Sequence, residues 1–434
     1  MVDRVPEHPG RVRLIPVPGE DNLYDLVRED GATVEGTPLC KATMLPDDVC
    51  NTLGLNTKTA EPKDAFLLCG DRIGDIKTTT RKGLGSNWLL CNGATIQASA
   101  YPELAQMLGG PFEGTWKNYQ IATTTTNFCR AMLYGNGYYV IGYTANNYPM
   151  IAYTTNPNGA WSTRQISNTA FDVYSMVYAD GYFVVCGYGS KSTYILYATS
   201  PSISWTLKQI ASSETNIAYL TYGNGKFVAC GGDASGHPRA AYAVHPGDTW
   251  TLVNAYSGQV DISCANFMNG QFCMFGNQYR STIEAAIYSS DGISWGYRSI
   301  RSDRNDAPCG AVYANGYYIV ALNSEILYST SLTGTWTVKK VAEYTPLRGI
   351  GCGSGYFFAV GDRGKCFYAT SPSGVWTEIT AYADADLWKI QYLNGYFITC
   401  GITSSYYPVV ASLLDGRVLP TISPSHAYAY IRAK

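Results

Sequence analysis

The residues of this sequence best suited to chemistry are arginines and aromatic residues that recur at one repeated position. Seven residues before each of seven repeated glycines stand, in chain order, Arg130, Tyr174, Ala218, Ser263, Cys309, Arg348 and Trp388. Arginine holds a carboxylate through two parallel hydrogen bonds, and a tyrosine beside an activating carboxylate can serve as a nucleophile. This set therefore raises glycoside hydrolysis as a candidate reaction, with Arg301 or Arg304 as a third arginine.

The set lacks parts that such a reaction needs. No acid occupies the repeated position next to Tyr174, so this tyrosine would have no activating carboxylate. The sequence also has no phosphate-binding loop and no Gly-x-Ser-x-Gly elbow. No two of the four histidines have metal-ligand spacing: His8, His237, His245 and His426. We therefore expect no catalytic residue, no metal and no cofactor, and a protein that is not an enzyme.

The repeated glycines follow Asn or Asp, and once Ser, in segments such as "YGNGYYVIG" and "YADGYFVVCG". Asn-Gly and Asp-Gly favour a two-residue hairpin turn with positive φ. An aromatic residue two positions later is expected to pack on one face of the returning strand. The glycines lie 39 to 46 residues apart: Gly137, Gly181, Gly225, Gly270, Gly316, Gly355 and Gly395.

A second hairpin signature follows about 20 residues further on in each unit. It has a Tyr, a polar turn and then a Trp, at Trp161, Trp205, Trp250, Trp295, Trp336 and Trp376. The copy "SSDGISW" resembles a shortened Asp-box, the turn motif of sialidase-type propellers, although the other copies mostly lack the Asp. This resemblance makes a sialidase-like glycosidase the enzymatic alternative.

Two hairpins in each unit give four short strands, repeated seven times. This period is typical of a β-propeller, because one unit alone cannot bury both of its faces. We predict an all-β chain with a seven-bladed β-propeller over residues 117–418, and a strand around Trp116 that completes the last blade. A β-solenoid or a stacked prism is the alternative.

The segment before the propeller carries a more specific pattern. Gly74-Asp75-Ile76, Trp88, Cys91-Asn92-Gly93-Ala94 and a helix from Tyr101-Pro102 to Leu108 resemble the phage tail collar domain. Residues 419–434 resemble the closing strand of phage tail and fibre proteins. The resemblance implies a homotrimeric virion protein with a small α+β collar-like domain, residues 70–116 plus 419–434. We expect its sheet to be completed by residues 427–432, with the propeller inserted.

Residues 1–69 are polar and rich in proline. "RVRLIPV" and "NLYDLVRE" alternate enough to form a hairpin, and "KATMLPDDVCNTLGL" offers a short helix. The segment resembles the N-terminus of structural proteins in phages of Gram-positive hosts, which implies an anchor to other virion proteins. A flexible leader is the alternative.

Composition excludes several partners. Of the 434 residues 46% are apolar and 15% are charged, and the net charge of −2 offers no basic field for nucleic acid. No apolar run is long enough for membrane insertion. The start lacks the apolar core of a signal peptide, so we expect a virion protein assembled in the host cytoplasm. Cysteines in "FVVCG", "FVACG" and "FITCG" are expected to be reduced core thiols.

The loops that enter the inner strands, and those that join the second and third strands, are expected to share one face and differ widely in sequence. Aromatic faces stack on sugars and amides bond their hydroxyls, so we predict a tail fibre or receptor-binding protein whose propeller binds a host glycan or protein. A capsid or tail decoration protein is the alternative. The candidate ligand residues are Arg130, Tyr174, Arg348 and Trp388 at the channel mouth, and Tyr279, Tyr406 and Tyr407 on the rim.

Overall fold

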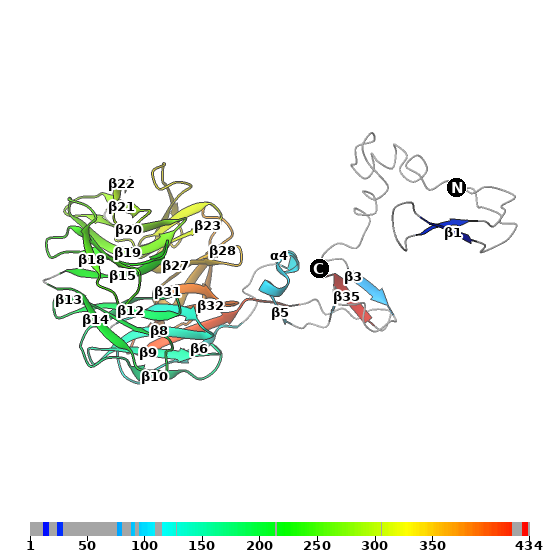
Figure 1. Ribbon diagram of the computed structural model, residues 1–434, viewed down its shortest axis with the longest axis horizontal. Helices are drawn as coiled ribbons and strands as arrows, with labels where there is room; N and C mark the ends of the chain where they lie inside the picture. Colours follow the sequence, from blue (N-terminus) through cyan, green and yellow to red (C-terminus); the bar gives the residue numbers. More distant parts are fainter. Residues whose placement is uncertain are drawn as a thin grey trace. The chain divides into compact units, whose positions relative to one another are not determined.

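The computed structural model describes residues 12–16, 24–28, 76–79, 88–91, 95–108, 115–126, 128–212, 215–304, 306–418 and 428–432. The chain divides into two compact units, residues 1–91 with 422–434 and residues 92–421. The larger unit holds seven four-stranded antiparallel sheets, each built from strands in the order of the repeat. These sheets are the blades of a seven-bladed β-propeller (Figure 1), which confirms the predicted fold class.

Each blade runs from an inner strand to an outer strand. Blades 1 to 4 consist of β7 (Cys129–Gly135), β8 (Tyr138–Ala145), β9 (Tyr148–Thr154), β10 (Ser162–Gln165); β11 (Asp172–Ala179), β12 (Tyr182–Gly189), β13 (Ser192–Ala198), β14 (Thr206–Ala211); β15 (Asn216–Gly223), β16 (Lys226–Gly232), β17 (Pro238–Ala243), β18 (Thr251–Asn254); and β19 (Val260–Met268), β20 (Gln271–Gln278), β21 (Glu284–Ser289), β22 (Gly296–Arg301). Blades 5 to 7 consist of β23 (Gly310–Ala314), β24 (Tyr317–Ala321), β25 (Glu325–Ser329), β26 (Thr337–Lys340); β27 (Leu347–Gly353), β28 (Tyr356–Gly361), β29 (Lys365–Ala369), β30 (Thr377–Thr380); and β31 (Ala385–Leu393), β32 (Tyr396–Thr403), β33 (Pro408–Leu414), β6 (Lys117–Gln120), with the short 3-10 turn η3 (Asp362–Gly364) before β29.

The turn between the first two strands of every blade has the predicted geometry. The Asn, Asp or Ser before each repeated glycine has φ between 45° and 51°, and the glycine itself between 73° and 84°. Positive φ at both central residues matches the right-handed twist of the flanking strands. The repeat is therefore set by a backbone requirement, which Asn-Gly meets with little strain.

The aromatic residue two positions after each turn glycine is buried, with at most 5% of its surface exposed. In six blades its ring lies 4.7 to 4.9 Å, between centroids, from an aromatic ring on the inner strand, as in the pair Tyr134 and Tyr139. Such pairs add roughly 0.5 to 1.5 kcal/mol beyond area burial. The sixth blade has Cys352 opposite Phe357 instead.

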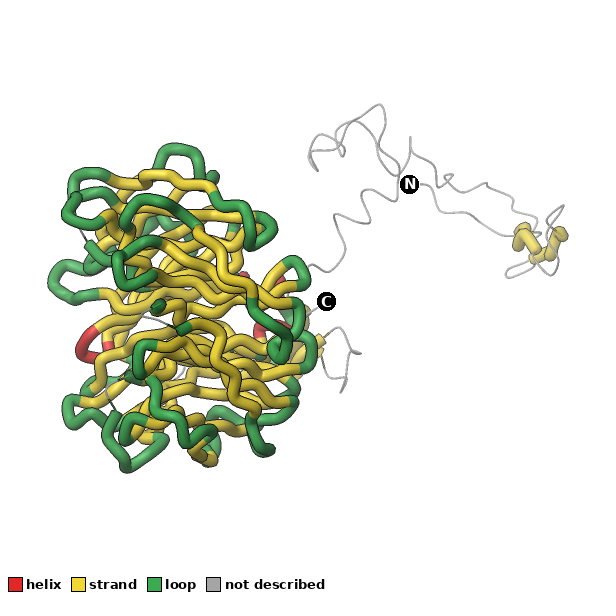
Figure 2. The backbone as a smooth tube through the Cα atoms, turned by 60° about the vertical axis from the view of Figure 1, so that its left-hand side comes forward, coloured by secondary structure: helices red, strands yellow, loops and turns green. Residues whose placement is uncertain are grey.

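The ring closes where the two ends of the repeat region meet. Strand β6 precedes blade 1 in the chain but pairs with β33, so it supplies the outer strand of blade 7 as predicted. The Ser412 hydroxyl donates to Asn158 Oδ1 at 2.8 Å, and the Cys400 thiol donates to the Cys129 carbonyl at 3.3 Å. Apolar side chains of blades 7 and 1 form one buried cluster. Because β6 closes blade 7 and all seven inner strands line one cavity, the blades form a closed ring and not a solenoid. Figure 2 shows that this unit consists almost entirely of strands and loops.

Short elements precede the propeller within the larger unit. Strand β5 (Thr95–Gln97) pairs with β34 (Gly416–Val418), so β34 belongs to no blade. The 3-10 turn η1 (Ala98–Ala100) and helix α4 (Pro102–Leu108) follow, and α4 has the predicted bounds. Leu104 and Ala105 of α4 are buried. No described helix is long and apolar enough to span a membrane.

The smaller unit contains a sheet in the order β3 (Ile76–Thr79), β35 (Tyr428–Arg432), β4 (Trp88–Leu90). A strand from after the propeller thus lies between two strands from before it, which confirms the expected pairing of residues 427–432. The domain boundaries stay a prediction. The predicted N-terminal hairpin forms between β1 (Val12–Pro16) and β2 (Tyr24–Arg28), whereas the predicted helix nearby lies outside the described residues.

Cysteines in the described part of the chain are free thiols, and eight of these ten are buried. Burial raises the pKa of Cys186 and of Cys273 to about 12. These thiols therefore act as small core residues, as their strand contexts predict.

Candidate functional site

A β-bulge stands near the start of the inner strand in most blades. The strand pairing skips one residue there, and the skipped residue is Arg130, Tyr174, Ser263, Arg348 or Trp388. A bulge re-aims the side chain of its extra residue. The bulge thus explains why the repeated position found in the sequence places diverse side chains at the channel.

A cavity of about 640 Å³ lies among the seven inner strands. Its walls include the predicted channel residues Arg130, Tyr174, Arg348 and Trp388, which come from four different blades. Ala218, at the same repeated position in blade 3, is completely buried, and Tyr219 lines the cavity there. The pairing of β15 with β16 is irregular between Asn216 and Tyr219.

The Arg130 guanidinium lies among three aromatic rings. Its central carbon is 3.9 Å from the ring centroid of Tyr174, 4.3 Å from that of Phe128 and 5.9 Å from that of Trp388. Aromatic faces attract a cation, and this attraction is strongest where water is excluded. The Arg130 Nε and Nη2 atoms are buried and donate to no atom of the described residues.

Arg348 is neutralised locally, in contrast to Arg130. Its Nε donates to Asp362 Oδ1 at 2.7 Å and its Nη2 donates to Asp362 Oδ2 at 3.2 Å. This two-point pair raises the pKa of Arg348. The guanidinium carbon also lies 5.4 Å from the ring centroid of Trp388, so Arg348 holds one wall of the cavity in place.

Sequence reasoning missed Lys389, which lines the same cavity. Its ammonium group forms no ion pair and no hydrogen bond with any described residue, and burial lowers the pKa of Lys389. It interacts electrostatically with the thiols of Cys264 and Cys309, in blades 4 and 5. Counting six residues back from the turn glycine would have found Lys389, because Ser175, Tyr219 and Cys264 line the cavity at that position in other blades.

The predicted rim residues occupy loops on the same face as the cavity mouth. The Tyr406 carbonyl accepts from the Thr126 amide at 2.8 Å, and the Tyr279 amide donates to the Gln259 carbonyl at 3.1 Å. Each bond joins a loop between second and third strands to a loop entering an inner strand. Tyr279 and Tyr406 are each 56% exposed, and Tyr407 is half-buried. None of the three lines the cavity.

A further exposed aromatic on an entering loop escaped the sequence analysis. Tyr344 precedes β27 and is 91% exposed. The "VAEYTPL" loop that carries it has no unusual length or polarity, so loop variation gave no signal there.

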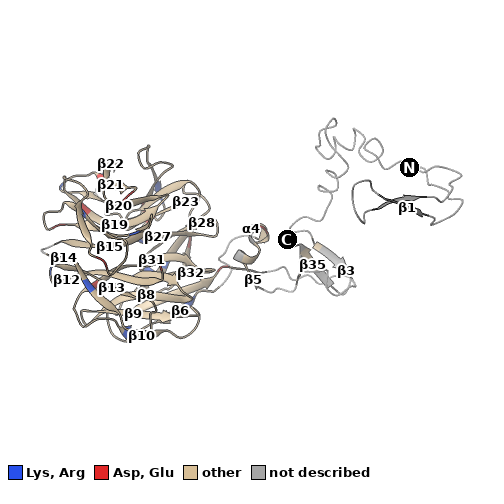
Figure 3. Ribbon diagram, viewed as in Figure 1, with Lys and Arg blue, Asp and Glu red and all other residues tan. Residues whose placement is uncertain are grey.

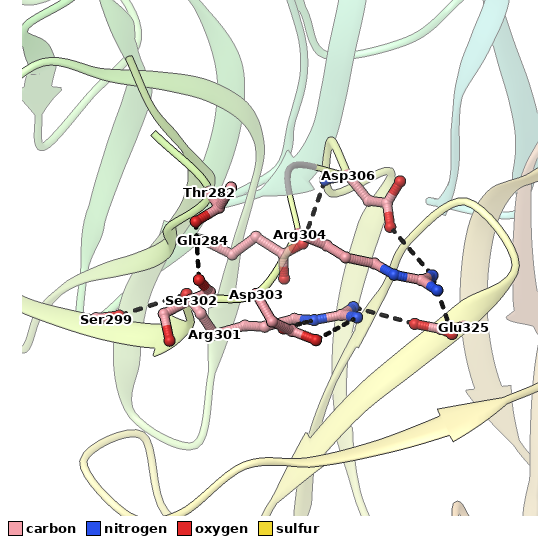
Figure 4. A network of polar contacts seen from close by, with 9 residues as sticks. All are labelled: Thr282, Glu284, Ser299, Arg301, Ser302, Asp303, Arg304, Asp306 and Glu325. Atoms are coloured by element: carbon pink, nitrogen blue, oxygen red, sulfur yellow. Dashed lines mark hydrogen bonds and ion pairs between the residues drawn. The ribbon is translucent and has the colours of Figure 1, made fainter. Parts of the chain in front are cut away.

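Arg301 and Arg304 are occupied by carboxylates and do not line the cavity. Arg301 bonds Asp303 at 2.6 Å and Glu325 at 3.0 Å, and Arg304 bonds Glu325 at 3.2 Å (Figure 4). Glu284 beside them is fully buried, and desolvation raises its pKa to about 7. Neither arginine supplies the third cation that a carboxylate-gripping triad needs.

The Asp-box turn lies at the other end of the blades. The Ile293 and Ser294 amides each donate to Asp291 Oδ1 at 2.8 Å, and these bonds lower the pKa of Asp291 to about 2. The Asn224 side chain, in a first-hairpin turn, donates to the Ser290 carbonyl at 2.8 Å. The two kinds of turn thus share one face, away from the cavity mouth, and the Asp-box is structural.

Charged side chains are sparse along the propeller strands (Figure 3). No group of three His, Cys, Asp or Glu side chains suited to a metal ion occurs among the residues that the structure describes.

Residues 74–121 match the family model of the Phage Tail Collar Domain. A search of curated proteins gives no match. The solved structure of YCF48 bound to D1 peptide is similar with a TM-score of 0.54 and 12% identity, covering 70% of this chain and 96% of that one. YCF48 from Cyanidioschyzon merolae is similar with a TM-score of 0.54 and 10% identity, covering 68% and 98%.

At these identities the solved structures support the propeller fold alone. The family match covers the segment whose motifs resemble the tail collar in the sequence. The collar match suggests a structural protein of the phage tail or virion, and the propeller fold is compatible with that role.

Proposed function

We propose that this chain is a tail fibre or receptor-binding protein, and that its propeller is the head that binds the host surface. The observation that carries the proposal is the chemistry of one propeller face. That face combines a cavity walled by Arg130, Tyr174 and Trp388 with exposed tyrosines such as Tyr279 and Tyr406. Aromatic faces beside polar groups are the usual composition of carbohydrate-binding surfaces.

The remaining assignments follow from the collar match. We propose that the N-terminal segment, residues 1–69, binds other virion proteins. We also propose that the protein is a homotrimer in the virion. The propeller is the proposed head, since its seven blades close into a ring of their own.

We also propose that the chain is not an enzyme. A glycosidase with a tyrosine nucleophile needs a carboxylate that activates the tyrosine. Tyr174 contacts Arg130 and the ring of Tyr219, and no described carboxylate forms a hydrogen bond with its hydroxyl. Release of reducing sugar from host cell walls by the purified chain would contradict this assignment.

Binding of the fluorescently labelled full chain to host cells tests the proposed function. We expect saturable binding that Trp388→Ala and Tyr279→Ser weaken. Val375→Ser is the matched control, because Val375 is 85% exposed on the turn between β29 and β30 at the opposite face. Saturable binding to phage capsids or tails without binding to cells would instead identify a decoration protein.

A further inference from the structure

The central cavity holds more positive charge than its neighbours neutralise. Three cationic side chains line it: Arg130, Arg348 and Lys389. Asp362 pairs with Arg348 only, and Asp306, the one carboxylate in the wall, lies 4.0 Å from Arg304. Arg130 and Lys389 thus have no anionic partner among the described residues.

An unpaired charge inside a protein is unfavourable, because burial removes its hydration without replacing it. Lys389 stands on β31 of blade 7 and lines the cavity, where burial lowers its pKa. The Arg130 guanidinium carbon lies 3.9 Å from the ring centroid of Tyr174, and its Nε and Nη2 atoms have no acceptor among the described residues. Two preorganised donors therefore remain for an incoming anion.

The rest of the wall indicates what kind of molecule carries that anion. The aromatic residues Tyr174, Tyr219 and Trp388 line the cavity together with the polar residues Ser263 and Asn323. Rings of this kind stack on pyranose faces, and the polar groups bond hydroxyls. A cavity of about 640 Å³ is within the usual range for small ligands.

We propose that the central cavity binds the anionic group, a carboxylate or a phosphate, of an acidic sugar, with Lys389 and Arg130 as its charged partners. The assignment of this sugar to the host surface rests on the function proposed above. Arg348, already paired with Asp362, fixes the position of Trp388 and adds no free charge.

Calorimetric titration of the full chain with three hexoses that share one ring tests the cavity. Glucuronate carries a carboxylate, glucose 1-phosphate carries a phosphate, and glucose is neutral. We expect at least one of the two anionic sugars to bind and glucose not to bind. The anionic sugar with the higher affinity shows whether the cavity prefers a carboxylate or a phosphate. A tetraglutamate peptide that binds more tightly than both sugars would overturn the proposal in favour of an acidic peptide.

Substitutions of Lys389 and Arg130 test whether these two cations bind the anionic group. Lys389→Gln and Arg130→Gln should each weaken the anionic sugar about tenfold or more, the effect of removing one charged hydrogen bond. Lys117→Gln is the matched control, since Lys117 lies exposed on the outer strand of the same blade as Lys389. If the wild type and Lys389→Gln bind the anionic sugar with equal affinity, the proposal is wrong. It is also wrong if neither glucuronate nor glucose 1-phosphate binds at millimolar concentration.

Binding to host cells distinguishes failure of the cavity proposal from failure of the receptor-binding function on which it rests. If the wild-type chain binds host cells and Lys389→Gln binds them equally well, the cavity proposal is wrong and the receptor-binding function stands. If the chain binds an acidic sugar through Lys389 but does not bind cells, the cavity site stands and the receptor-binding function is wrong. Thermal unfolding confirms that each variant is folded.

Discussion

The Arg130 guanidinium lies 3.9 Å from the ring centroid of Tyr174, and the two residues come from the inner strands of neighbouring blades. Each is the extra residue of a β-bulge. The contact therefore links blades 1 and 2 at the cavity mouth, and it exists because both strands deviate from regular pairing at the same level.

This contact predicts how Tyr174 responds to substitution. Tyr174→Phe keeps the aromatic face and should leave the free energy of unfolding nearly unchanged. Tyr174→Leu removes it and should lower that free energy by about 1 kcal/mol, since the guanidinium is shielded from water. Denaturant unfolding measures both values, and equal losses for Phe and Leu would show that the ring face contributes nothing.

Replacing Lys389 should stabilise the protein. Lys389→Met keeps the length of the side chain and removes a half-buried charge that has no described partner, so we expect a gain of about 1 kcal/mol. The same change at exposed Lys117 should alter stability by less than about 0.5 kcal/mol. A lower melting temperature for Lys389→Met would mean that the ammonium is already compensated within the chain.

Glu284 should make stability depend on pH. Its folded-state pKa of about 7 lies above the ordinary value of 4.5, because desolvation disfavours the carboxylate. Between these values the folded chain binds more protons than the unfolded chain, so the Glu284 contribution is full below pH 4.5 and is lost as pH rises through 7.

Glu284→Gln should therefore flatten the stability profile between pH 5 and 8 and raise stability at pH 8 by about 1 to 2 kcal/mol. Glu343→Gln provides the comparison, because the side chain of Glu343 is 71% exposed. Urea unfolding at several pH values gives the profiles. Parallel profiles for wild type and Glu284→Gln would contradict the assigned pKa.

The Asp-box turn of blade 4 should contribute more to stability than the equivalent turns. Asp291→Ala removes an acceptor of two backbone amides and of the Ser289 hydroxyl, which should lower stability by about 1 to 2 kcal/mol. At the matching place in blade 5 the Ser331 hydroxyl makes two longer bonds, one of 3.3 Å with the Thr333 hydroxyl and one of 3.4 Å from the Thr333 amide. Thermal unfolding should show a larger drop in melting temperature for Asp291→Ala than for Ser331→Ala. Equal drops in melting temperature would contradict this prediction.

The fold could be predicted from sequence because its repeat rests on backbone chemistry. Asn136-Gly137 and its six counterparts need positive φ, and few dipeptides supply it. Ring closure was predictable for a related reason, since blade 7 lacks a fourth strand in sequence order and the segment after Trp116 offers one.

The site was predictable only in part. Counting from the turn glycine found Arg130, Tyr174, Arg348 and Trp388, because their bulges stand at a constant distance from the turn. In blade 3 the same count gives Ala218, which is buried and does not line the cavity. Which charges stay unpaired depends on contacts between blades, and these have no local signature in the sequence.

Adsorption of the phage that carries this chain tests the central claim most directly. The measured quantity is the rate at which phage disappears from suspension with host cells, with and without saturating purified full chain. If the propeller is the receptor-binding head, the wild-type chain slows adsorption several-fold, and the combined Trp388→Ala and Tyr279→Ser variant slows it less. An unchanged adsorption rate, with the chain fully folded and in excess, would contradict the account.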